Sequence, residues 1–179
     1  MTFLLTSVRL STKSKVSSGF CRWNLSMNIL LMMLRAPRPS RTDDMKAIAN
    51  PRWIKKGYDG LTFFGYIITH TQQEAEAFQR SGSFKNHEMI HLYQARACHD
   101  SWILFYLRYG WYWLLASRYH KHLKNAGYLL NPFELEAYAN MFDIHYLDEK
   151  KSGTNEWRRY ARMSLKERLN IYRNTRMSL

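Results

Sequence analysis

The chain has 179 residues, the length of one compact domain with tails rather than of two domains. Hydrophobic residues make up 46% of the sequence, which is enough for a buried core and excludes a globally disordered protein. Lysine and arginine outnumber aspartate and glutamate by 27 to 14, giving a formal net charge of +13. A charge of this sign suggests an anionic partner, such as nucleic acid or a membrane surface.

The positive charge is concentrated at the two ends of the chain. Residues 1–42 contain seven basic and no acidic side chains, and residues 150–179 contain nine basic and two acidic ones. Residues 43–149 contain eleven basic and twelve acidic side chains and are nearly neutral. The basic ends have two interpretations: the tail is a solvated amphipathic helix, or the ends attach this body to an anionic membrane surface. Nucleic acid is not an expected partner, because the basic tail carries no recognised nucleic-acid motif.

The composition also predicts the organisation and surroundings of the chain. We expect a basic extension outside the fold over residues 1–44, a folded domain over 45–150 and a basic, amphipathic helical tail over 151–179. The two cysteines, Cys21 and Cys98, form no CxxC pair, which argues against a disulfide scaffold and a thiolate zinc site. Reducing surroundings follow, so we expect a cytoplasmic protein, peripheral to the inner face of a membrane where it contacts one.

The predicted elements run from one strand to several helices. The β-branched and aromatic residues of 61–69 predict a strand, and residues 71–83 predict either a loop or a short helix. Residues 86–99 contain no glycine or proline and predict a helix. Asn131 and Pro132 supply an N-cap and a first-turn proline for a helix that extends to about residue 147. We expect an α+β fold, mainly helical, with a small β-sheet edge.

Residues 101–119 form a strongly apolar and aromatic segment with two interpretations. The segment is shorter than the ~20 residues that span a bilayer, and Arg108 lies near its centre. Its tryptophans and tyrosines are typical of a membrane-interface belt. The alternative is a helix buried against the helix of residues 86–99.

The segment His87-Glu88-Met89-Ile90-His91 is an HExxH motif on a predicted helix. Histidines at positions i and i+4 project from one helical face, so both imidazoles can reach one Zn²⁺ ion. Glu88 would then lie beside the open coordination position, where a general base can accept a proton from zinc-bound water.

A zinc site of this kind needs a third protein ligand, and two glutamates are candidates. Glu134 and Glu136 both follow His91 on a second predicted helix, about 200° apart, so they cannot both be primary ligands. Glu136 has Asn140 one turn further, which could hydrogen-bond a ligand histidine. Against Glu134, the pattern Asn131-x-x-Glu134 is a capping box that would occupy its carboxylate at the helix start.

The stretch HEMIHLYQ, followed by an aromatic segment and NPFELEAYAN, resembles small bacterial HExxH proteins similar to the Glu-zincin class of zinc metallopeptidases. The resemblance covers roughly residues 57–147 and implies a minimal zincin-like fold, one Zn²⁺ ion and peptidase activity. In related zincins the ligand is the first glutamate of a Glu-x-x-Ala-Asp motif. The match places that ligand at Glu134, with Tyr138 where the family has aspartate, and this departure keeps Glu136 open.

These observations lead to two alternative functions. The first is a zinc metallopeptidase for a peptide or protein substrate, with Glu88 as general base and Tyr138 as a candidate group that stabilises the oxyanion. The second is a non-enzymatic, basic helical protein of a membrane surface or of nucleic acid, with a degenerate HExxH. Metal content separates the two.

Overall fold

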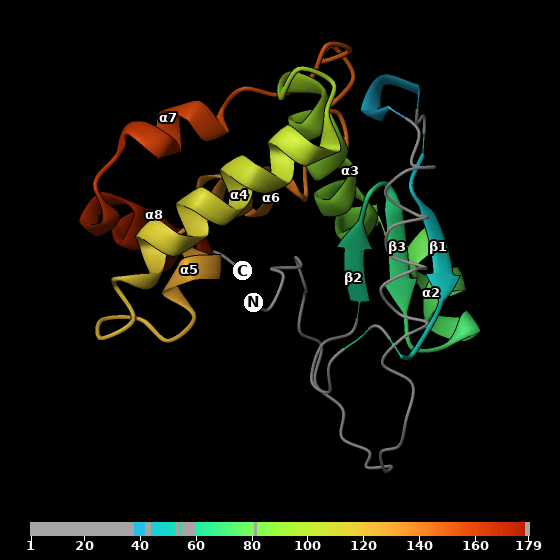
Figure 1. Ribbon diagram of the computed structural model, residues 1–179, viewed down its shortest axis with the longest axis horizontal. Coiled ribbons are helices and arrows are strands. Elements are labelled where there is room, and N and C mark those ends of the chain that lie inside the picture. The colour runs from blue at the N-terminus through green and yellow to red at the C-terminus, as the bar shows by residue number, and fades with distance from the viewer. Residues whose placement is uncertain (1–37, 42–43, 53, 55–59, 81, 178–179) are drawn as a thin grey trace. The chain divides into compact units, whose positions relative to one another are not determined.

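The computed structural model describes residues 38–41, 44–52, 54, 60–80 and 82–177. The chain divides into two compact units, residues 1–79 and 80–179, and each is described by itself. Among the described residues, helices predominate and the strands form one small sheet (Figure 1). The prediction of an α+β, mainly helical fold with a small sheet is therefore confirmed. Most of the expected extension over 1–44 lies outside the described residues, and the expected domain boundaries stay predictions.

The first unit contains a three-stranded sheet in the order β1-β3-β2. Its elements are η1 (Pro39–Arg41), β1 (Lys46–Ala49), β2 (Gly60–Phe63), β3 (Tyr66–Thr69) and α2 (Gln72–Arg80). β1 runs parallel to β3, with Lys46 opposite Tyr66, and β2 runs antiparallel to β3, with Phe63 opposite Tyr66. The central strand β3 is more buried than the edge strand β1, as expected for apolar residues between two neighbours.

The single strand expected over residues 61–69 is wrong, because this segment is a hairpin. The chain reverses at Phe64 and Gly65, whose φ angles of 48° and 85° are both positive. Two consecutive positive φ angles are the requirement of a two-residue turn whose twist matches the flanking strands. Gly65, in the middle of the apolar run, was the sequence signal for this turn.

Helix α2 fulfils the helical interpretation of residues 71–83 and begins with a complete capping box. The Glu74 carboxylate accepts hydrogen bonds from the backbone N–H of His70 and Thr71, at 2.8 and 3.1 Å. In return, the Thr71 hydroxyl accepts from the Glu74 N–H at 3.1 Å. Gln79 donates to the carbonyl of Met45, which precedes β1, at 3.0 Å and so connects α2 to the sheet.

The second unit is helical and is organised around a short central helix. It contains α3 (Gly82–Ala97), α4 (Trp102–Ser117), α5 (Ala126–Leu129), α6 (Pro132–Asn140), α7 (Trp157–Arg162) and α8 (Leu165–Met177). α6 packs against α3, α5, α7 and α8, and α4 packs against α3 and α5. The predicted tail is thus helical and packs against α6. Residues 132–137 of α6 are all buried, which makes this helix the core of the unit.

The helix expected up to about residue 147 ends earlier, at Asn140. The Asn86 side chain of α3 donates to the backbone carbonyls of Asn140, Met141 and Asp143, at 3.1, 3.1 and 2.8 Å. Because the side chain of another helix donates to these carbonyls, the carbonyl groups at the end of α6 have hydrogen-bond partners without further helical turns. A long-range contact of this kind cannot be read from local propensity.

α4 is a helix with one buried side, as in the second interpretation of residues 101–119; contact with a membrane interface stays a prediction. It begins at its N-cap Ser101, whose hydroxyl accepts from the Leu104 N–H at 3.3 Å. One side buries Trp102, Phe105 and Tyr109, while the other exposes a set of large apolar side chains: Ile103, Leu104, Leu107, Trp111 and Leu114. Among the described helices, none has both the length and the apolar character needed to cross a bilayer.

Candidate metal centre

The two histidines of the HExxH motif lie on one face of α3, a turn apart. Both side chains are fully buried, and their Nε2 atoms are 3.2 Å from each other. The rings meet edge to face with centroids 4.9 Å apart. The predicted helix and the predicted direction of His87 and His91 are therefore confirmed.

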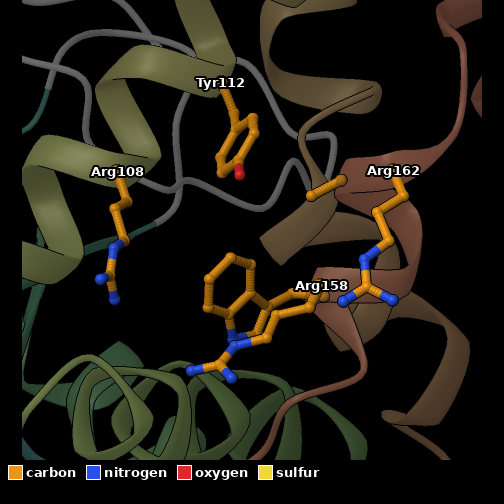
Figure 2. Close-up of a pocket in the computed structure, with 6 residues that line it drawn as sticks. Arg108, Tyr112, Arg158 and Arg162 are labelled. Carbon is orange, nitrogen blue, oxygen red and sulfur yellow. The ribbon is translucent and has the colours of Figure 1, made fainter.

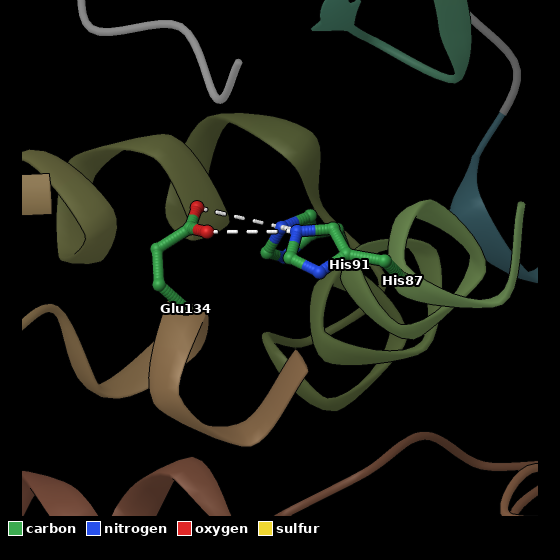
Figure 3. A group of neighbouring side chains, drawn as sticks. All are labelled: His87, His91 and Glu134. Carbon is green, nitrogen blue, oxygen red and sulfur yellow. Dashed lines mark hydrogen bonds and ion pairs between the residues drawn. The ribbon is translucent and has the colours of Figure 1, made fainter. Parts of the chain in front are cut away.

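Glu134 reaches these histidines from the first turn of α6. Its two carboxylate oxygens lie 3.5 Å from His87 Nε2 and 3.5 Å from His91 Nε2 (Figure 3). The Tyr109 hydroxyl of α4 donates to Glu134 Oε1 at 2.8 Å, and Asn131 donates to the Tyr109 carbonyl at 3.2 Å. Three helices thus fix the carboxylate against the two imidazoles.

The predicted capping box at Asn131 and Glu134 is only half formed. Asn131 is the N-cap, since its side-chain oxygen accepts from the Phe133 N–H at 3.2 Å, and Pro132 occupies the first turn. The Glu134 carboxylate is directed to the histidines and Tyr109 instead of returning to the cap. The objection to Glu134 that followed from the capping pattern is therefore removed.

Gln94, one turn beyond His91 on α3, determines the protonation of that imidazole. Gln94 Nε2 donates to the Phe133 carbonyl and to Glu136 Oε2, both at 2.9 Å, so its other terminal atom is the oxygen. This oxygen lies 2.8 Å from His91 Nδ1 and requires a proton there. In neutral His91 the Nε2 lone pair then faces His87 and Glu134, which is the form that binds a metal.

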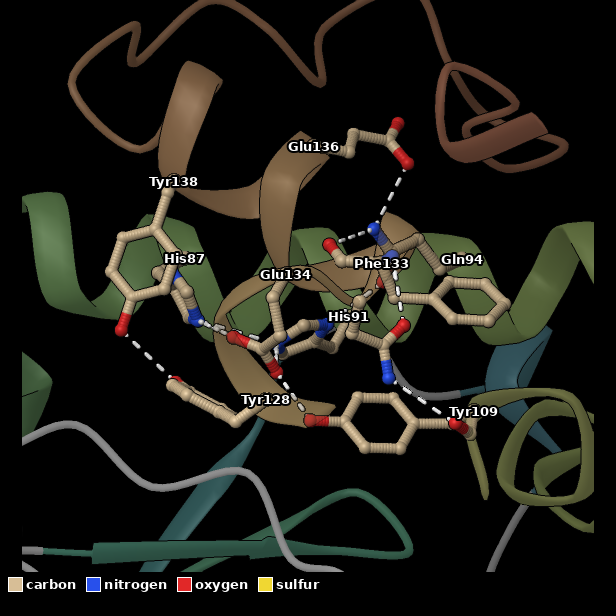
Figure 4. A network of polar contacts seen from close by, with 10 residues as sticks. His87, His91, Gln94, Tyr109, Tyr128, Phe133, Glu134, Glu136 and Tyr138 are labelled. Atoms are coloured by element: carbon tan, nitrogen blue, oxygen red, sulfur yellow. Dashed lines mark hydrogen bonds and ion pairs between the residues drawn. The ribbon is translucent and has the colours of Figure 1, made fainter. Parts of the chain in front are cut away.

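Glu136 is buried as completely as Glu134 but makes different contacts. Its carboxylate accepts from Gln94 (Figure 4). It also accepts from the Tyr146 hydroxyl at 2.8 Å and from the Trp157 backbone N–H at 3.1 Å. It supports His91 through Gln94 rather than facing both histidines. The expectation that Asn140 bonds a ligand histidine is wrong, because its amide donates to the Glu136 carbonyl at 2.8 Å.

The electrostatics of the cluster favour a positive charge beside the carboxylate. Burial alone would lower the pKa of His87, but its contact with Glu134 and the charges of Glu88 and Glu134 outweigh this, so the pKa is raised. Burial alone would raise the pKa of Glu134, but the charge of His91 and the contacts with His87 and Tyr109 outweigh it, so the pKa is lowered. The surroundings keep Glu134 ionised.

The geometry of the cluster fits a zinc ion. Among the described residues, the group of potential metal ligands is formed by His87, His91 and Glu134, with ligand atoms within 4.8 Å of one another. Zinc bonds of about 2.0–2.1 Å at tetrahedral angles require ligand atoms roughly 3.4 Å apart, and the observed separations are 3.2, 3.5 and 3.5 Å. Within the described part of the chain, Glu134 Oε2 and His87 Nδ1 are both buried without a hydrogen-bond partner.

The two predicted catalytic residues lie near this group. Glu88 follows His87 on α3, is only 2% exposed, and is close enough for its charge to act on His87, Tyr109 and Tyr138. The Tyr138 ring packs edge to face on the His87 ring, with centroids 4.7 Å apart. Its hydroxyl lies 2.9 Å from that of Tyr128. Burial, followed by the charge of Glu134, raises the pKa of Tyr138, so its hydroxyl keeps its proton.

Five contributors to the site were not found from the sequence: Gln94, Tyr109, Tyr128, Tyr146 and the backbone of Trp157. Gln94 had a recognisable signal, because a polar residue three positions after His91 lies next to it on the helix. Tyr109 and Tyr146 carried none, since their contacts depend on how α4 and the segment after α6 pack. Comparison of the chain with protein-family models, with curated proteins and with solved structures found no match to any of the three.

Proposed function

We propose that this chain is a zinc-dependent metallopeptidase of the Glu-zincin kind, with His87, His91 and Glu134 as its metal ligands. The observation that carries the proposal is the arrangement of three buried ligand atoms at tetrahedral-edge separations. Support comes from the His91 imidazole, which Gln94 holds with its Nε2 lone pair toward the other two ligands. A buried cluster that is held by hydrogen bonds alone would need neither these separations nor this orientation of His91.

A zinc ion bound by this set supplies a water of lowered pKa and polarises the carbonyl of a peptide bond. Glu88 is the group that moves protons: its carboxylate accepts the proton of the attacking water and returns it to the departing amine. Its position directly after His87 places it beside the ligands. The reaction consumes one water and yields a carboxylate and an amine, with no other reactant.

Tyr138 is the group we assign to the developing oxyanion. Its neutral hydroxyl can donate a hydrogen bond, and its ring lies against the ligand His87. The contact with the Tyr128 hydroxyl gives the Tyr138 oxygen a fixed position. The proposed substrate is a peptide or protein, the class that the HExxH chemistry serves.

Complete burial of the ligands favours a second candidate, a closed metal site without hydrolysis. His87, His91 and Glu134 are fully buried and Glu88 is nearly so, and structural zinc sites are closed while catalytic sites keep one position open. Both candidates require the metal. They differ in whether Glu88 acts as a general base.

The test is the zinc content of protein purified without chelator, together with its activity on a mixed peptide library. We expect about one zinc per chain, which His87→Ala and His91→Ala each reduce strongly. Glu88→Gln should retain the zinc, because it leaves the ligands intact, and should lower hydrolysis by roughly 10²–10⁴-fold.

Exposed Glu76→Gln of α2 is the matched control, and we expect it to leave zinc and hydrolysis unchanged. Zinc-free wild-type protein contradicts both candidates. Zinc-loaded protein without hydrolysis of any library peptide contradicts the peptidase and supports the closed metal site.

A further inference from the structure

A second polar site lies between α4 and α7, at the surface of the second unit. It is a pocket of about 300 Å³. Figure 2 shows that Arg108 and Tyr112 enter from α4, while Arg158 and Arg162 enter from α7. Trp157 and Ala161 complete the lining. The pocket shares no lining residue with the metal centre and is independent of the proposed function.

The lining of this pocket is positively charged. Three of its six residues are arginines, and none of the six is acidic. A fourth guanidinium, that of buried Arg168, lies 5.9 Å from the centre of the Tyr112 ring. Arg168 has a structural role, because it donates to the carbonyls of Tyr160 and Ala161 at 2.8 Å. Of the three lining arginines, Arg158 and Arg162 are exposed and can turn to a ligand, whereas Arg108 is half-buried and contacts the Cys98 thiol.

Two donors in the pocket lining are buried without an acceptor. Arg108 Nη1 and Trp157 Nε1 both lack a hydrogen-bond partner within the part of the chain that the structure describes. Leaving a buried donor unpaired costs about 1–3 kcal/mol, and more when the donor is charged, so such groups generally have a partner in the working protein. Both belong to residues that line the pocket, which favours a ligand that accepts hydrogen bonds.

The pocket is supported by rigid neighbours. The Trp157 ring packs on Phe133 with centroids 4.5 Å apart, and the Arg158 guanidinium lies 5.4 Å from the centre of the Trp157 ring. Arg108 lies 5.9 Å from the same ring. Cationic groups near an aromatic ring lose part of their freedom, so less entropy is lost when they bind an anion.

We propose that this pocket binds a phosphate group carrying two negative charges, such as inorganic phosphate or a phosphate monoester. Planar guanidinium groups match the oxygens of phosphate in pairs, and a dianion is favoured over a carboxylate by three neighbouring cations.

The phosphate can come from two sources that share this chemistry. One is a free phosphate in solution. The other is a lipid headgroup, which the exposed apolar side chains of α4 favour: Ile103, Leu107 and Trp111 lie on the helix that supplies Arg108 and are 60, 64 and 58% exposed. Apolar side chains beside arginines are typical of helices that lie in a membrane interface.

The test measures binding of two probes at constant ionic strength. The first is inorganic phosphate against chloride, by calorimetry. The second is sedimentation with phosphatidylcholine vesicles that contain phosphatidic acid, compared with vesicles of equal charge made with phosphatidylserine. The variant Arg158→Ala/Arg162→Ala removes two exposed guanidinium groups, and Arg159→Ala, exposed on the same helix but outside the lining, is its matched control.

We expect the double variant to bind at least one probe about tenfold more weakly or worse, and the control to stay within about twofold. Weakening with inorganic phosphate supports the site and identifies free phosphate as a ligand. Weakening confined to phosphatidic acid vesicles supports the site and identifies a headgroup. The proposal is overturned if neither probe binds, or if Arg159→Ala weakens binding as much as the double variant.

Discussion

The metal centre and the arginine pocket are opposite in chemistry although Phe133 connects them. The Phe133 carbonyl accepts from Gln94, which holds His91, and the Phe133 ring packs on Trp157 of the pocket. The metal centre is completely buried and contains an ionised carboxylate, whereas the pocket is open and contains unpaired donors. The difference between the two sites lies in the charge of their side chains: a carboxylate faces two imidazoles at one, and three arginines line the other. The proposed ligands follow from this difference, a cation for the first site and an anion for the second.

The largest effect that tests this contrast concerns the two glutamates of α6. Glu134→Ala removes a ligand and should weaken zinc binding by more than about 100-fold, measured by competition with a chromogenic chelator. Glu136→Gln keeps one acceptor oxygen for the Gln94 contact and should weaken zinc binding by at most roughly 10–100-fold, the range for groups that orient a ligand. Equal losses would mean that the assignment of Glu134 as the ligand is incorrect.

The sequence was sufficient for the HExxH helix but not for the choice between these glutamates. The i, i+4 spacing fixes His87 and His91 on one face regardless of the rest of the fold. Glu134 and Glu136 are equally buried on one helix, and only the packing of α6 on α3 decides which one faces the histidines. The capping pattern at Asn131 suggested the wrong role for Glu134, because its carboxylate faces the two histidines and accepts a hydrogen bond from Tyr109 instead of the cap.

Two of the predicted element boundaries were also wrong. The Phe64–Gly65 reversal was overlooked within an apolar run, although the glycine was visible. The end of α6 at Asn140 depends on Asn86 of a different helix. Local signals identified where helices start, at Ser101 and Asn131, because the N-cap acts within its own first turn.

Gln94 offers the next sharpest test of the buried site. Gln94→Leu removes the acceptor that fixes the proton of His91 on Nδ1 and leaves Glu136 without one of its donors. We expect zinc affinity to fall by roughly 10–100-fold and the unfolding free energy to fall by about 1–3 kcal/mol, measured by chelator competition and by denaturant titration. Gln94→Glu is the companion variant. It keeps an acceptor for His91 but turns a carboxylate oxygen toward the Glu136 carboxylate, so we expect it to lower the unfolding free energy by more than leucine does.

Retention of zinc affinity in Gln94→Leu would show that His91 adopts its metal-binding form without help. Glu134, and not the contact of Gln94 with His91, would then account for the zinc affinity of the site.

The smallest effect is expected on zinc affinity when the arginines of the pocket are substituted. Arg158→Ala/Arg162→Ala changes two exposed side chains that make no contact with the ligands, so zinc affinity should stay within about twofold and the unfolding free energy within about 0.5 kcal/mol. Chelator competition and denaturant titration measure both. A large change in zinc affinity would mean that Trp157, whose backbone holds Glu136 and whose ring lines the pocket, couples the two sites. Phosphate and zinc would then have to affect each other's binding by the same factor, because coupling between two ligands is reciprocal.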